Sequence, residues 1–104
     1  MNTITIIQKR PNWLPVSLEV ETETVEELIG EGYRLKIMEK ARGDKHELLM
    51  LYDGNGLNDD RPANCIVQNE LYYGNLYFVG RTSEGLTDVP VGIRTLREKY
   101  GILR

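Results

Sequence analysis

Few side chains in this chain have the types and spacing that chemistry requires. His46 is the only histidine and Cys65 the only cysteine. Such a pair can act as a base and its nucleophile, because catalytic partners meet in space and not in sequence. A loop histidine and a small buried thiol are the simpler interpretation. The pair also falls short of the four ligands of a structural zinc site. We therefore predict no catalytic residue, no metal, no cofactor and no enzymatic activity.

An oxygen-rich segment begins at Asp53 and includes Asp59 and Asp60, which raises the question of calcium. The EF-hand pattern needs a ligand at its fifth position and a glycine at its sixth. Counted from Asp53, these positions hold Leu57 and Asn58. The segment also lacks the Gly-Lys-Ser/Thr sequence of a phosphate-binding loop. The sequence therefore favours a solvated turn here.

Acidic side chains are concentrated in one early part of the chain. No Lys or Arg occurs between Pro11 and Tyr33. Six glutamates fall within thirteen residues of this interval, and we call them the acidic run: Glu19, Glu21, Glu23, Glu26, Glu27 and Glu31. They form either a solvated face or a patch that docks on the basic surface of another protein, one that normally holds nucleic acid. Direct nucleic-acid binding is not expected, because such domains are usually basic and this chain has a net charge of −3.

An aromatic residue offers a second candidate contact. Trp13 stands between Pro11 and Pro15, and tryptophan is enriched at protein interfaces. It can serve as an interface anchor or as a lid over the core, and the sequence leaves both open. The tyrosines near Tyr72 and Tyr77 are expected in the core or in an interface.

An alternative site involves a small ligand. Arg61 could hold a phosphate in a bidentate fork, and Asn64 and Tyr72 would line a pocket near residues 53–77. In this alternative the protein binds, and so sequesters, a small molecule or a nucleotide.

The elements that must position these residues follow from hydrophobic periodicity. Alternating or continuous apolar runs predict strands at 3–7, 16–20, 33–38, 48–52 and 74–80. The last is an aromatic and β-branched run stopped by Gly74 and Gly80, and we expect it at the centre of the sheet. Residues 41–45 read as a hairpin loop and residues 57–73 show no clean period.

Two helices are expected. Thr24 and Glu27 have capping-box spacing before Gly30. The second helix starts at Thr87 or Asp88 with Pro90 in its first turn, and Gly101 ends it. Its apolar stripe consists of Val89, Ile93, Leu96 and Tyr100.

Length and composition indicate one domain over residues 1–104, with 88–104 as a C-terminal helical extension. The predicted class is α+β, a mostly antiparallel sheet of about five strands with one short helix and a C-terminal helix. No apolar stretch approaches the ~20 residues that cross a bilayer. A single cysteine excludes an internal disulfide. We therefore expect a cytoplasmic protein without a membrane segment.

The chain also resembles a family of small uncharacterised proteins carried by phages, plasmids and other mobile elements of Gram-positive bacteria. The resemblance covers roughly Thr3 to Asp88 and rests on a dispersed pattern: Thr24, Leu28, Ile29, Gly30, Tyr33, Tyr52, Asp53, Gly56, Leu57, Arg61, Pro62, Asn64, Gly74, Phe78, Val79, Gly80, Leu86 and Thr87. Tyr72 departs from it, because members usually have an aliphatic residue there.

The resemblance implies no catalytic residue. It implies a context in which small acidic proteins disable host defence, by covering an enzyme's surface or by sequestering a signalling nucleotide. The expectation is therefore a non-enzymatic, anti-CRISPR-like inhibitor that binds a host nuclease through the acidic run and Trp13.

Overall fold

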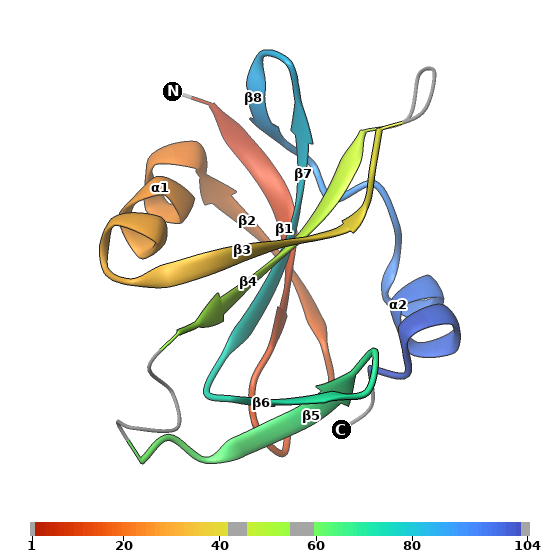
Figure 1. Cartoon of the computed structure of the whole chain (residues 1–104). Helices are drawn as coiled ribbons and strands as arrows, with labels where there is room; N and C mark the ends of the chain where they lie inside the picture. The colour runs from red at the N-terminus through yellow and green to blue at the C-terminus, as the bar shows by residue number, and fades with distance from the viewer. Residues whose placement is uncertain (1, 42–45, 55–59, 103–104) are drawn as a thin grey trace.

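The computed structural model describes residues 2–41, 46–54 and 60–102 (Figure 1). Neither helix in this part of the chain is long and apolar enough to cross a membrane. The elements confirm the predicted α+β class and follow in this order: β1 (Thr3–Lys9), β2 (Val16–Glu21), α1 (Thr22–Gly30), β3 (Tyr33–Glu39), β4 (Glu47–Asp53), β5 (Ala63–Val67), β6 (Glu70–Tyr73), β7 (Leu76–Thr82), β8 (Gly85–Thr87) and α2 (Ile93–Tyr100).

The main sheet has six strands in the order β2-β1-β7-β4-β3, with the short β8 paired to the end of β7. All neighbouring strands are antiparallel. The predicted central position of the strand near 74–80 is confirmed, since β7 pairs with β1, β4 and β8. The prediction that Gly80 stops this strand is wrong. A Cβ at Gly80 would lie 2.2 Å from the carbonyl oxygen of Asp88, so the glycine permits a close chain crossing.

Both faces of the main sheet are buried, as the alternation along β4 shows. Leu48 and Met50 belong to one apolar cluster, whereas Leu49 and Leu51 belong to another. The first cluster lies on what we call the hairpin face, under β5, β6 and α2. The second lies on the α1 face, where Val25 of α1 is buried. Figure 1 shows the two helices on opposite sides of the sheet.

Helix α1 begins earlier than the sequence predicted. Its N-cap is Glu21 and it has no side-chain capping hydrogen bond, so the capping box of Thr24 and Glu27 is wrong. Strand β2 pairs with β1 as far as Glu21, and the chain turns directly from strand into helix. The apolar side of the helix faces the sheet, because Val25 is buried and Ile29 packs against the same cluster.

Helix α2 begins later than predicted. Its N-cap is Gly92, so the expected start at Thr87 or Asp88 is wrong and Pro90 precedes the helix. Asp88 instead accepts a hydrogen bond from the backbone N–H of Thr5 at 2.8 Å.

The predicted apolar stripe of α2 is confirmed except for Val89, which precedes the helix. Leu96 and Tyr100 are buried, with Val89 and Ile93 packed against their cluster. Gly101 ends the helix in the left-handed conformation with φ 68°.

The sequence pattern did not predict the β5–β6 hairpin or β8. Gln68 and Asn69 join β5 to β6 with φ angles of 51° and 69°. A register shift between Ala63 and Cys65 interrupts the alternation in this segment, which explains its unclear period. Most of the predicted loop at 41–45 and of the oxygen-rich segment lies outside the described residues.

Candidate partner-binding surface

The acidic run divides between two elements at one edge of the sheet. Glu19 and Glu21 are exposed on β2, whose intervening residue Val20 packs with the α1-face cluster. Because side chains alternate along a strand, Glu19 and Glu21 point to the hairpin face. Strand β2 is an end strand of the main sheet, so these carboxylates border its edge.

The remaining glutamates belong to α1, which lies on the other face. They are exposed, and the helical repeat directs them away from the buried Val25. Their positions are Glu23, Glu26 and Glu27 within the helix and Glu31 at its C-cap. Carboxylates therefore flank the β2 edge on both sides and do not form one flat patch.

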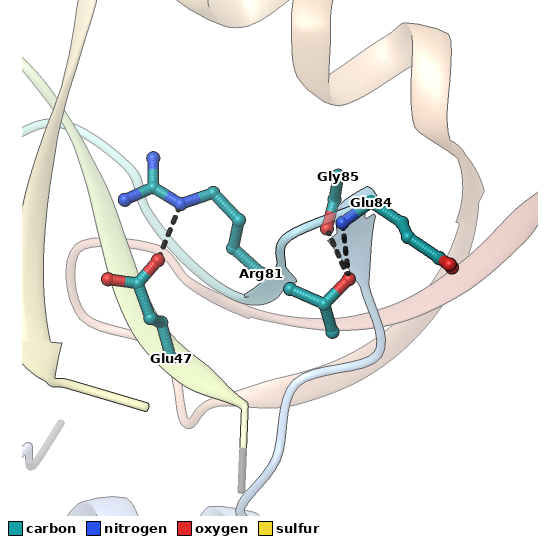
Figure 2. A network of polar contacts seen from close by, with 5 residues as sticks. Glu47, Arg81, Glu84 and Gly85 are labelled. Carbon is teal, nitrogen blue, oxygen red and sulfur yellow. Dashed lines mark hydrogen bonds and ion pairs between the residues drawn. The ribbon is translucent and has the colours of Figure 1, made fainter. Parts of the chain in front are cut away.

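No ion pair within the described part of the chain neutralises the acidic run. Figure 2 shows one pair that lies elsewhere, in which Arg81 Nε donates to Glu47 Oε1 at 2.7 Å across β7 and β4. The other ion pairs are Lys36–Glu70, Arg61–Asp53, Arg94–Glu98 and Lys99–Glu39. These five pairs among the described residues use carboxylates outside the acidic run.

The charges of α1 act against the stability of the helix itself. Glu27 lies four residues from both Glu23 and Glu31, and like charges at this spacing repel. The last turn contains no basic residue, and Glu31 stands at the C-cap, where the helix dipole favours cations. Helix stability therefore does not explain Glu27 and Glu31, whereas Glu23 lies in the first turn, where the helix dipole favours an anion.

Trp13 lies on the surface in the loop between β1 and β2. Its side chain is 60% exposed, so the lid interpretation is wrong. The guanidinium of Arg10 lies 4.7 Å from the centroid of the Trp13 ring, and the neighbouring Leu14 is also exposed. An oriented indole at this position fits the anchor interpretation.

Asn64, a residue of the alternative ligand site, connects the hairpin to the main sheet. Its Nδ2 donates to the carbonyl oxygens of Lys9 and Gly74, both at 2.7 Å. Its Oδ1 accepts from Lys9 Nζ at 2.8 Å, and Lys9 also donates to Arg10 O. Lys9 is fully buried, and this burial lowers the pKa of its ammonium group although Cys65 opposes the shift.

Tyr72 and Arg61 also have partners within the chain. The Tyr72 hydroxyl donates to Glu70 Oε2 at 2.5 Å and accepts from Lys36 Nζ at 3.3 Å. Burial and the Glu70 hydrogen bond raise the pKa of Tyr72. Arg61 Nε lies 3.1 Å from Asp53 Oδ2. The three residues thus bond to different parts of the chain, and no hydrogen bond or ion pair among the described residues joins one of them to another.

The two residues with potential chemistry lie in separate segments of the chain. His46 is exposed just before β4, and Cys65 is half-buried in β5. Burial raises the pKa of the Cys65 thiol while Lys9 opposes the shift, which disfavours the reactive thiolate. No group of three metal-binding side chains occurs among the described residues.

Sequence reasoning did not identify Lys9 or Arg10. Lys9 ends an isoleucine-rich strand, and nothing in its sequence context marks it as buried.

Comparisons with known proteins identify no relative, since no family model, curated protein or solved structure matches this chain.

An open depression of about 580 Å³ lies on α2, lined by Ile93, Arg94, Arg97 and Glu98.

Proposed function

We propose that this chain is a non-enzymatic cytoplasmic protein that covers a basic surface of a larger protein. The partner we propose is a nuclease of bacterial defence whose basic groove normally holds nucleic acid. The acidic run and Trp13 are the contact residues. The resemblance to proteins of mobile elements favours this context.

The observation that carries the proposal is the charge of the acidic run, which no ion pair among the described residues offsets. Without these six glutamates, the formal charge of the chain would change from −3 to +3. All six are exposed, and the ion pairs of the described residues are made elsewhere. Such a surface raises the association rate with a basic partner and makes the rate sensitive to salt.

The small-ligand alternative receives less support from the geometry. Asn64 uses its amide in hydrogen bonds that fix the hairpin. Tyr72 is buried against Tyr52, with ring centroids 5.1 Å apart. Neither side chain is available without breaking a contact of the fold.

Affinity capture from a nuclease-treated bacterial lysate tests the proposal. Wild-type protein and a variant with all six glutamates changed to Gln serve as baits, and Glu84→Gln is the matched control. We expect wild type and the control to retain a nucleic-acid-binding protein that high salt releases, and the sixfold variant to lose it. The captured protein should then lose DNA or RNA binding when wild type is added. Equal capture by wild type and the sixfold variant would contradict the proposal.

A further inference from the structure

We propose that the outer edge of β2 binds an extended segment of another protein, which joins the main sheet as an additional strand. The segment carries Lys or Arg at alternate positions. This inference rests on the proposed function and specifies the chemistry of the partner.

The edge of β2 is regular and open. Six consecutive residue pairs join it to β1, from Thr3 with Glu21 to Gln8 with Val16, without a register shift. No strand pairs with its other side in the described part of the sheet. An edge of this kind presents backbone N–H and C=O groups that can pair with a further strand.

The opposite edge of the same sheet is protected. Strand β3 has a register shift between Ile37 and Glu39, and it carries Arg34 and Lys36. Bulges, prolines and charged side chains, lysine above all, are the usual devices that prevent strand addition. Strand β2 contains no bulge and no proline, and its charged side chains are all negative. Its edge therefore repels an acidic strand and can pair with a basic one.

The side chains of β2 define what can bind there. Glu19 and Glu21 point to the hairpin face, whereas Val16 and Leu18 point to the α1 face. Opposite charges on directly opposed residues stabilise a strand pair. An incoming strand therefore needs Lys or Arg at every second position and apolar residues between them. The exposed Trp13 precedes β2 and extends the apolar contact.

A second copy of this chain does not fit the edge. Pairing of two β2 strands would gather the Glu19 and Glu21 side chains of both copies along the joined strands. Like charges in this arrangement repel. The occupant is therefore a different, basic chain.

Binding of synthetic peptides to the full chain tests the inference. The probe is a short peptide of alternating Lys and Val with blocked ends, measured by calorimetry and by amide hydrogen exchange of residues 16–21. A peptide N-methylated at alternate residues keeps the charge but cannot form the strand ladder on its methylated edge. A block peptide with the same composition loses the alternation.

We expect the alternating peptide to bind and to slow amide exchange in β2. Both control peptides should bind at least about tenfold more weakly, the equivalent of one or two lost hydrogen bonds. The Glu19→Lys, Glu21→Lys double variant should lose binding, whereas Glu26→Lys on α1 should reduce it less.

The outcomes separate this inference from the proposed function. If the N-methylated and alternating peptides bind equally and the rate of amide exchange in β2 is unchanged, the inference of strand addition is wrong. Salt-sensitive capture through the acidic run would still support the proposed function in that case. If no basic peptide binds and the lysate capture also fails, both are wrong.

Discussion

The charge pattern of α1 leads to a stability prediction that needs no partner. Glu27 is exposed in the last turn of the helix, four residues from Glu23 and from Glu31. We predict that Glu27→Lys stabilises the free protein. A substitution that stabilises the fold while it weakens binding is the expected signature of a surface selected for recognition.

The magnitude follows from the geometry. The substitution removes two like-charge pairs worth roughly 0.2–0.5 kcal/mol each and replaces them with opposite-charge pairs of similar size. A cation in the last turn adds about 0.3–1 kcal/mol through the helix dipole. Exposed charges are screened, so the expected gain in unfolding free energy is about 1 kcal/mol at low salt. For a chain of this size, that corresponds to about 4–6 °C in Tm.

Urea denaturation and thermal melting at low and at high salt measure the effect. Glu27→Gln should give about half the gain, roughly 0.5 kcal/mol, since it removes the repulsion without adding a cation. Glu84→Lys is the matched control, because Figure 2 shows the Glu84 carboxylate pointing away from the contacts of the β7–β8 turn. A Glu27→Lys variant less stable than wild type, or a gain that high salt leaves unchanged, would refute the reasoning.

Three further predictions concern the fold. Asn64→Ala should lower the unfolding free energy by about 2–4 kcal/mol in urea denaturation, because it removes three hydrogen bonds at the hairpin, two of them to buried backbone carbonyls. An effect below that of a surface substitution would contradict the connecting role. Gly80→Ala should cost about 1–3 kcal/mol or more from the contact with the Asp88 carbonyl, whereas Gly30→Ala, which meets nothing within 4 Å, should be neutral or stabilising by the same measurement. The pKa of Tyr72 is raised in the folded state, so its contribution to stability is fully present below the unfolded pKa of about 10 and is lost as pH rises through the folded pKa. Wild type should therefore lose stability above about pH 10 more steeply than Tyr72→Phe. Parallel pH profiles of the two proteins would show that Tyr72 is not responsible.

Much of the sheet could be predicted because its strands have a simple apolar pattern. β3 alternates, and β4 and β7 are continuously apolar because both of their faces are covered. The failures have local causes. The bulge near Asn64 disrupts the alternation of β5, and the three residues of β8 are too few for a detectable period. Helix α2 starts later than predicted because Asp88 accepts a hydrogen bond from the backbone of Thr5, a residue far from it in the sequence.

The candidate surface was predicted in composition but not in shape. Counting charges located the acidic run, and the prolines drew attention to Trp13. In the structure, the alternation of β2 and the helical repeat of α1 place carboxylates on both sides of one strand edge. This arrangement exists only because β2 lies at the end of the sheet. For Arg61, Asn64 and Tyr72, residue type indicated a ligand site, but their observed partners belong to the fold.

The amino-acid sequence by itself determined the fold class, the central strand and the excess of negative charge in one segment, because periodicity and composition are local properties. Only the tertiary structure decided which strand lies at an open edge, which cations are already paired and which polar side chains hold the hairpin in place. These properties depend on contacts between residues far apart in the chain, such as Lys9 with Asn64, and no local pattern encodes such a contact.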